Sequence, residues 1–411
     1  MRIVKLSVLI LSLLLSSVLY AQEKEYLPQW QEGYMDLHII ATGRGDANFF
    51  ILPDGTKMLV DCGDVGTRWE YPVLPNDSKT PAQWVETYIR HFSKGTPSEG
   101  HVDHFLLTHF HTDHMGNVDT MEDGKRYGLS GVTEIAEYLT FGKWVDRDYP
   151  NYTFPSETFL DAVSHGFMAE YVEFVPYQQK KRGTVFEKFL IGSDAQFNLV
   201  FNPEKYAGLF QIRNLGANGC SWTGNGFATK VNYDGADDQI KDENWMSCSI
   251  KITYGKFSYY TGGDLPGGYA SKNKYGVNLD FETPVAKICG PVTAMRANHH
   301  ATNNSTNYNQ LRLLRPKTII ITSAKYTQPD HTTLFRMADQ MVLPGERDIF
   351  CNCDAAKDKV AAIYYDNIKA IGHIVLRVYE GGNEYQVFVL DNQDPTYPVL
   401  YKSDVRDSQT R

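Results

Sequence analysis

The sequence lacks the features that mark several large protein classes. It has no excess of positive charge: 40 lysines and arginines stand against 49 aspartates and glutamates, which gives a formal net charge of −9. A surface that binds nucleic acid normally carries a basic patch or stripe, so we do not expect a nucleic acid as partner. The short basic cluster Lys180–Arg182 is expected to be a solvated helix end.

Cysteine is scarce and irregularly spaced. The six cysteines of the 411 residues do not form the regular framework of a disulfide-stapled domain. Cys351 and Cys353 are too close together for the usual Cys-x-x-Cys metal or redox motif. We expect buried thiols, with a single bridge left open for an oxidising compartment. Repeats and low-complexity segments are also missing, which argues against a repeat architecture.

Beyond the N-terminus, no apolar run is long enough to cross a bilayer. At the N-terminus, Arg2 and Lys5 precede an apolar run from Leu6 to Tyr20. This pattern is typical of a secretory signal peptide, which we place at residues 1–21. We therefore expect a periplasmic or secreted protein whose mature chain, 22–411, has no membrane span.

Strand and helix patterns alternate along the chain. Apolar runs predict strands. The runs at 48–52 and 57–61 are joined by a turn at Pro53–Thr56. The predicted strands and hairpins cover 36–40, 48–52, 57–61, 102–108, 249–261, 318–323 and 372–391. The predicted helices cover 81–92, capped by Thr80, 132–141 and 157–177. The alternation in both halves indicates an α/β fold. The pattern weakens from 142 to 243, where we expect a long insertion within a single domain.

The densest chemistry lies in Thr108-His109-Phe110-His111-Thr112-Asp113-His114, directly after a predicted strand. Only 12 residues of the chain are histidine, so three of them within six positions are unlikely to be a chance cluster. Residues two apart on an extended segment face the same side, so His109 and His111 can hold one ion. Asp113 and His114 can reach a second ion beside it. Imidazole and carboxylate suit zinc, and to a lesser degree manganese or iron.

This motif resembles the first metal-binding motif of the metallo-β-lactamase superfamily. Asp61-Cys62-Gly63, Thr261–Leu265 and Asn298–Thr302 resemble later motifs of that family in the same order. The resemblance implies a metallo-β-lactamase αββα sandwich and two divalent metal ions. It also implies that Asp264 bridges the two ions and that Asp61 supports the site without binding metal.

A closer resemblance exists within the superfamily and covers roughly residues 34–390. The order of these motifs is similar to that in the metallo-hydrolase domain of DNA-uptake competence proteins and in secreted teichoic-acid phosphorylcholine esterases. The residues that carry it are Gly43–Ala47, Asn244, His299-His300, Arg315–Lys317 and Asp330-His331.

Several ligand and catalytic roles stay open. His299 and His300 are adjacent and should not both bind one ion; similarity to the esterases favours His300, with His299 as the alternative. His165 is a further candidate ligand for the first ion, although it sits in a predicted helical run and competence-type domains often lack this ligand. Asp113 can orient the attacking water. His331 can donate a proton or bind a substrate oxygen, or it is an ordinary surface histidine.

The ligands and the resemblance imply an exported metal-dependent hydrolase. Our first hypothesis is a phosphodiesterase in which two ions share Asp264 and a water. Its substrate would be a small molecule or a cell-envelope component, such as a phosphorylcholine ester or a nucleotide. One alternative is a lactone or β-lactam amide hydrolase, against which Asp264 stands where several β-lactamases use cysteine. Another is a metal-stabilised binding protein without turnover. The sequence leaves the oligomeric state open.

Overall fold

The structure, a computed structural model, describes residues 24–67, 70–117, 127–233, 240–268, 279–323 and 325–410. The expected signal peptide, residues 1–21, lies outside the described residues. Among the helices that are described, none is both long and apolar enough to span a membrane.

In the described part of the chain, ten strands form the first sheet. Their order is β18-β17-β16-β1-β2-β3-β4-β5-β6, with β19 paired to β17. The pairs among β1, β2 and β3 are antiparallel, whereas β3 to β6 run parallel. The strands are β1 (Met35–Ile39), β2 (Asn48–Ile51), β3 (Lys57–Val60), β4 (His101–Leu106), β5 (Thr140–Asp146), β6 (Val185–Lys188), β16 (His373–Val378), β17 (Glu384–Leu390), β18 (Val399–Lys402) and β19 (Arg406–Asp407).

The second sheet has nine strands within the described ranges, in the order β15-β14-β13-β12-β11-β10-β7-β8-β9. Like the first sheet, it changes from antiparallel pairs around β10 to parallel pairs from β11 onward. The strands are β7 (Phe210–Ala217), β8 (Cys220–Trp222), β9 (Thr229–Val231), β10 (Ser249–Tyr254), β11 (Phe257–Thr261), β12 (Ala294–Arg296), β13 (Thr318–Ile321), β14 (Asp348–Cys351) and β15 (Ile368–Ile371).

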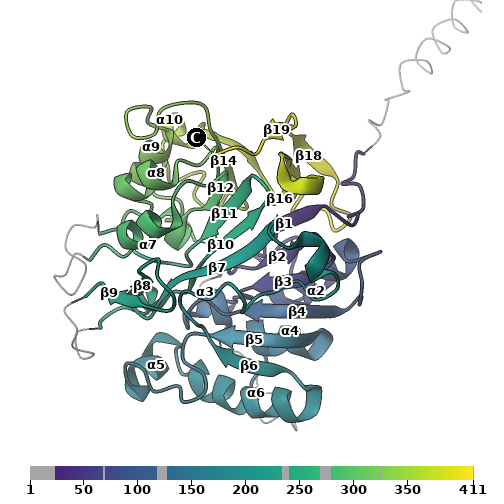
Figure 1. The fold of residues 1–411 in the computed structure, drawn as a ribbon, viewed down its shortest axis with the longest axis vertical. Helices are drawn as coiled ribbons and strands as arrows, with labels where there is room; N and C mark the ends of the chain where they lie inside the picture. Colours follow the sequence, from purple (N-terminus) through teal and green to yellow (C-terminus); the bar gives the residue numbers. More distant parts are fainter. Residues whose placement is uncertain are drawn as a thin grey trace, which may run out of the picture.

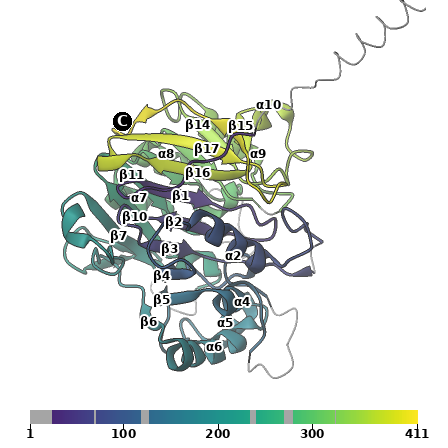
Figure 2. The same cartoon turned by 90° about the vertical axis from the view of Figure 1, so that its right-hand side faces the viewer.

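The two sheets pack face to face between two layers of helices (Figures 1 and 2). Apolar side chains such as Leu37, Phe50, Ile252 and Tyr259 fill the space between the sheets. Separate apolar clusters join helices to the outer face of each sheet. The helices on the first sheet are α2 (Pro81–Phe92), α4 (Gly131–Tyr138) and α6 (Phe167–Arg182); those on the second are α7 (Glu282–Cys289), α8 (Tyr308–Leu314) and α9 (His331–Ala338), with the short α10 (Ala362–Tyr365) beside α9. The predicted α/β class and αββα layering are confirmed.

Local sequence signals account for most element boundaries. Helix α2 has the predicted bounds, because Thr80 and Gln83 form a reciprocal capping box at its start. The prediction of one helix over 157–177 is wrong. The helix is broken into α5 (Glu157–Val163) and α6, because His165 and Gly166 adopt left-handed backbone conformations between them.

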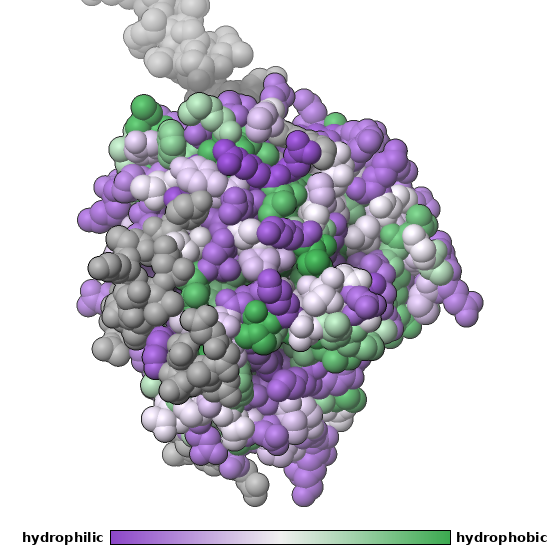
Figure 3. Space-filling view, turned by 60° about the vertical axis from the view of Figure 1, so that its left-hand side comes forward, coloured by the Kyte–Doolittle hydropathy of each residue, from purple (hydrophilic) through white to green (hydrophobic). Residues whose placement is uncertain are grey.

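The middle stretch, expected as an insertion over 142–243, supplies β6 to the first sheet and β7 to β9 to the second, besides α5 and α6. All six cysteines are free thiols, and five of them are buried. On the face shown in Figure 3, hydrophobic residues occur in several small groups among hydrophilic ones.

Candidate metal centre

Four loops bring the predicted polar residues together, and each loop follows a strand. Asp61 follows β3, and the segment 109–114 follows β4 and enters the short helix α3 (Thr112–Met115). Asp264 follows β11, and His300 follows β12. Since β3 and β4 are parallel neighbours, as are β11 and β12, their carboxyl ends lie together at one edge of each sheet, which is where α/β proteins form ligand sites.

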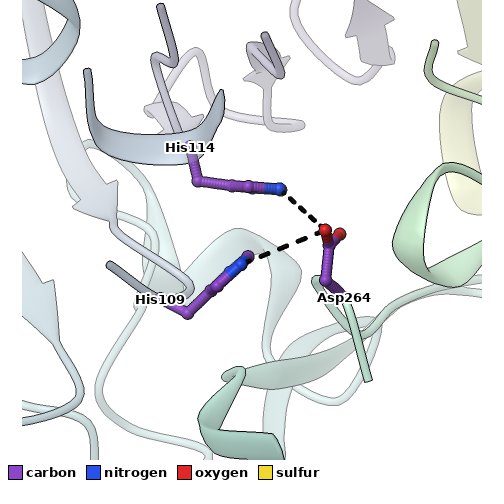
Figure 4. Close-up of side chains that lie close together, drawn as sticks. All are labelled: His109, His114 and Asp264. Atoms are coloured by element: carbon purple, nitrogen blue, oxygen red, sulfur yellow. Dashed lines mark ion pairs between the residues drawn. The ribbon is translucent and has the colours of Figure 1, made fainter. Parts of the chain in front are cut away.

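The carboxylate of Asp264 lies at the centre of the cluster. Its Oδ2 atom is 3.2 Å from Nε2 of His114, 3.1 Å from Nε2 of His300 and 4.0 Å from Nε2 of His109. Figure 4 shows His109 and His114 directed at this carboxylate from two sides. One carboxylate oxygen thus faces three imidazoles from two loops, the one after β4 and the one after β12.

The two remaining predicted ligands extend the cluster in opposite directions. Nδ1 of His111 lies 3.2 Å from Nε2 of His109, and Oδ2 of Asp113 lies 3.4 Å from Nε2 of His300. Two groups of possible metal donors result, His109 with His114 and Asp264, and Asp113 with His114 and His300, while His111 lies beside His109.

Asp61 holds His114 in one orientation. Its carboxylate accepts hydrogen bonds from the backbone N–H of Thr108 at 2.7 Å, from the Thr108 hydroxyl at 2.8 Å and from Nδ1 of His114 at 2.8 Å. This bond keeps a proton on Nδ1, so Nε2 is the nitrogen that faces the cluster and that an ion would bind in place of a second proton. This supporting role without direct binding is the one that the family resemblance implies for Asp61.

Arg296, paired with Asp46, lies on the side of Asp264 that faces away from the histidines. The buried Arg296 guanidinium donates to Asp46 and lies 3.3 Å from Oδ1 of Asp264, which leaves Oδ2 of Asp264 to face the histidines. Arg296 also donates to the backbone oxygen of Gly263 at 2.6 Å. Oδ1 of Asp46 is 3.4 Å from Nδ1 of His300, so Asp46 supports His300 much as Asp61 supports His114.

The charges of the cluster favour a cation. Burial alone would lower the pKa of His114, but the Asp264 and Asp61 carboxylates outweigh it and raise this pKa to about 10. Burial is likewise outweighed at His300, where Asp264 and Asp46 hold the pKa well above its ordinary value. The surplus of carboxylates thus stabilises positive charge at the centre of the cluster.

The donor set fits divalent metal ions. Within the part of the chain that the structure describes, the Nε2 atoms of His114 and His300 are buried and make no hydrogen bond, although carboxylates lie near them. A buried nitrogen without a hydrogen bond is costly in an ordinary core, and metal coordination removes that cost. Imidazole nitrogens and carboxylate oxygens in two adjoining groups suit two such ions.

The structure separates the roles of the two adjacent histidines. His299 donates from Nδ1 to Asn304 at 2.8 Å, and its Nε2 lies 3.2 Å from the Asn244 amide, so both ring nitrogens are engaged outside the cluster. Only His300 turns its Nε2 toward Asp264. Three successive residues, His299, His300 and Ala301, have left-handed backbone conformations, which makes this sharp reversal possible and concentrates strain at the site.

The other two predicted histidines lie outside the cluster. His165, at the break between α5 and α6, lines the same cavities as His111. His331 begins α9 with 58% of its side chain exposed, and it contacts Asp330 and Tyr364. His331 is absent from the described cavity lining, so its predicted catalytic role stays a prediction.

Two connected cavities open onto the cluster. The inner one, about 310 Å³, is lined by Asp113, Asp264, His299 and Lys325. The outer one, about 950 Å³, extends between α5 and the segment 240–244. They share His111, Val163, His165 and Asn244, so a substrate can reach the cluster through the outer cavity.

Comparisons with known proteins find only structures of low sequence identity. No protein-family model matches the sequence, and no curated protein matches it either. Among solved structures, the chain is similar to the short form of human tRNase Z, with 12% identity and a TM-score of 0.33 over 69% of this chain and 91% of that one. It is also similar to a long-form RNase Z from yeast, with 13% identity and a TM-score of 0.36 over 79% of this chain and 41% of that one. Similarities this weak carry no argument about function, which rests on the site itself.

Sequence reasoning missed three site residues. Arg296 lies in a buried strand, Lys325 follows another strand, and Glu243 accepts a hydrogen bond of 2.9 Å from the backbone N–H of Phe110 between His109 and His111. The position of Lys325 just after the predicted strand 318–323 was a usable signal, whereas no strand was predicted around Arg296. Nothing in the local sequence pointed to Glu243.

Proposed function

We propose that the protein is an exported metal-dependent hydrolase of the metallo-β-lactamase type that cleaves phosphodiesters. The observation that carries the hydrolase assignment is the convergence of His109, His114 and His300 on one carboxylate, Asp264, with His111 and Asp113 beside them. The phosphodiester class, and export, rest on the motif resemblance and on the N-terminal pattern at 1–21.

In this proposal, the cluster would hold two divalent ions. His109 and His111 would supply ligands to the first, and Asp113, His114 and His300 to the second, with Asp264 between them. Ions bound in this way supply an activated water and polarise the substrate oxygen, with zinc the best match to the donors.

The surrounding residues keep this arrangement fixed. Arg296 holds Oδ1 of Asp264, so that Oδ2 points to the middle of the site. Asp61 and Asp46 fix the rings of His114 and His300. Positions fixed in advance reduce the reorganisation needed when charge develops in the transition state.

Asp113 borders the inner cavity and is the residue we assign to orient the attacking water. Protonation of the leaving group is left open between His331 and His299: His299 lines the inner cavity, but its Nδ1 proton is donated to Asn304. A phosphorylcholine ester and a nucleotide are the two substrate types that we would compare first.

Metal analysis combined with hydrolysis assays tests this function. We expect about two metal ions per chain, with metal-dependent turnover of bis-p-nitrophenyl phosphate or p-nitrophenyl phosphorylcholine. His111→Ala should abolish turnover. His101→Ala changes a histidine at the opposite end of β4 and should leave turnover as in the wild type.

Other outcomes separate the alternatives. Turnover of a lactone or a β-lactam, without turnover of either phosphodiester, would show that the protein is a lactone or β-lactam hydrolase instead of a phosphodiesterase. Bound metal without turnover of any of these compounds would indicate a metal-stabilised binding protein. Protein that binds no metal after incubation with zinc, manganese or iron would contradict the proposal altogether.

A further inference from the structure

A lysine lies in the inner cavity beside the metal-binding cluster. Nζ of Lys325 is 2.5 Å from Oδ2 of Asp113, the same oxygen that lies 3.4 Å from Nε2 of His300. A protonated lysine donates hydrogen bonds and does not bind metal ions. Lys325 therefore adds a fixed positive charge at the edge of the cluster rather than another ligand.

Hydrogen bonds and an aromatic contact hold the turn that carries Lys325. Its backbone N–H donates to the side chain of Gln328 at 3.1 Å, and its carbonyl accepts from the backbone N–H of Gln328 at 3.0 Å. The backbone oxygen of Gln328 accepts from the hydroxyl of Ser323 at 2.5 Å, and both Gln328 and Ser323 are buried. The neighbouring Tyr326 packs edge-on against Tyr71, a second residue of the cavity wall.

The Lys325 side chain borders the inner cavity. The Lys325 side chain is 32% exposed, against 8% for Asp113. An ammonium has three N–H donors, and the contact with Asp113 uses one of them. A substrate oxygen in the inner cavity can accept from the others without breaking the ion pair.

We propose that Lys325 binds a negatively charged, non-bridging oxygen of the reacting phosphoryl group, and that the inner cavity thereby selects anionic phosphodiesters over neutral esters. This inference rests on the proposed function. The same positive charge would orient a phosphorylcholine substrate, because Lys325 repels a quaternary ammonium from the inner cavity. The phosphoryl group enters the inner cavity, and the choline group stays in the outer one.

Two substrates with the same leaving group test the selection. Bis-p-nitrophenyl phosphate is an anion, whereas diethyl p-nitrophenyl phosphate is neutral. Lys325→Met should lower kcat/KM for the anion by roughly 10- to 100-fold, the usual effect of losing a hydrogen bond to a charged group, and should change kcat/KM for the neutral ester much less. Lys325→Arg should restore most of the loss, and Lys256→Met, at the β10–β11 turn, serves as the control.

A binding measurement separates this inference from the proposed function. Inorganic phosphate should bind the zinc-loaded wild type and bind zinc-loaded Lys325→Met roughly 10-fold or more weakly by calorimetry, even if the wild type hydrolyses no phosphodiester. Equal losses on both esters, unchanged phosphate affinity, or a lower metal content in Lys325→Met would overturn the inference. The last result would show that Lys325 acts only through the position of Asp113.

Discussion

Arg147 and Glu243 form a bidentate ion pair, and neither side chain is exposed to solvent. Nε and Nη2 of Arg147 each donate to one carboxylate oxygen of Glu243 at 2.6 Å. Arg147 also lies over the ring of Phe110, whose backbone N–H donates to Glu243. This pair therefore fixes the position of Phe110, which lies between His109 and His111, the two residues assigned to the first ion.

Breaking this pair should loosen the first ion site. Arg147→Met leaves the buried Glu243 carboxylate uncompensated, which should cost about 3–5 kcal/mol of the free energy of unfolding and weaken binding of the first ion. Denaturant unfolding of the metal-free protein and zinc titration measure the two effects. In the double variant with Glu243→Met, much of the stability should return, whereas the zinc affinity should stay low. Zinc affinity at the wild-type level in both variants would contradict the role of the pair.

Gly63 marks a place where two loops of the site touch. A side-chain carbon at this position would lie 1.8 Å from the backbone oxygen of Asp113, which itself accepts from the backbone N–H of Asp46. Gly63→Ala must therefore push the Asp113 loop away, and we expect a lower melting temperature and loss of the second metal ion. Gly183→Ala, at the open C-terminal end of α6, meets no neighbouring atom within 4 Å, so only the left-handed backbone opposes it, at a cost of about 1–2 kcal/mol. Metal content and thermal unfolding check both variants, and two ions per chain in Gly63→Ala would refute the close-packing argument.

Asp61→Asn should reverse the protonation of His114. An asparagine can keep the hydrogen bond from the Thr108 backbone through its oxygen, which turns its N–H₂ group toward His114. His114 would then accept at Nδ1 and carry its proton on Nε2, facing the cluster. We expect roughly 10- to 100-fold weaker binding of the second ion, measured by competition with a chelator. Asp103→Asn changes a buried carboxylate away from the cluster, which accepts a hydrogen bond of 2.7 Å from the backbone N–H of Lys57, and should leave metal affinity unchanged.

Two buried histidines outside the site should make stability depend on pH. Burial lowers the pKa of His38 to about 4 and that of His373 to about 3, and both rings pack against Tyr88 of α2. In the unfolded chain their pKa returns to about 6.5, so below that pH the unfolded chain binds protons that the folded protein does not. Their contribution is therefore fully present above about pH 6.5 and is lost as the pH falls toward 4.

His373→Asn isolates one of these groups. The substitution can keep the hydrogen bond of 3.0 Å from the backbone N–H of Ala41, because an asparagine oxygen can take the place of Nδ1. Between pH 6.5 and 4, the free energy of unfolding should then fall less steeply, by up to about 1.4 kcal/mol per pH unit. Urea unfolding of metal-free protein across this range measures the slopes. Parallel curves for the variant and the wild type would show that His373 does not titrate as expected.

The parts of the site that are close in sequence could be predicted, and the parts that depend on packing could not. The segment His109–His114 and its position after a strand follow from local spacing. Asp264 followed from the order of motifs. The ion pairs of Arg296 with Asp46 and of Lys325 with Asp113 join residues more than 200 positions apart, so only the fold reveals them.

The fold shows the same division. Helix α2 was predicted with its bounds because Thr80 and Pro81 mark its start, and the hairpins at 249–261 and 372–391 were predicted from alternating apolar residues and glycine turns. The break at His165 was missed because apolar residues continue on both sides of it. Two of the strands between 142 and 243, β8 and β9, were missed because they are only three residues long and β9 is exposed, so they leave little apolar pattern.

The pairing of β1 with β16 constrains how this chain can reach its native state. His38 lies opposite Val375, so the second strand partner of β1 is more than 330 residues further along the chain. A nascent chain emerging from the ribosome cannot complete the first sheet until β16 has been made, and β1 offers an unpaired edge until then. Contacts this distant in sequence favour slow folding. We therefore expect the protein to need protection from aggregation during synthesis, by a holding chaperone or an equivalent, to a greater degree than a fold built from neighbouring strands.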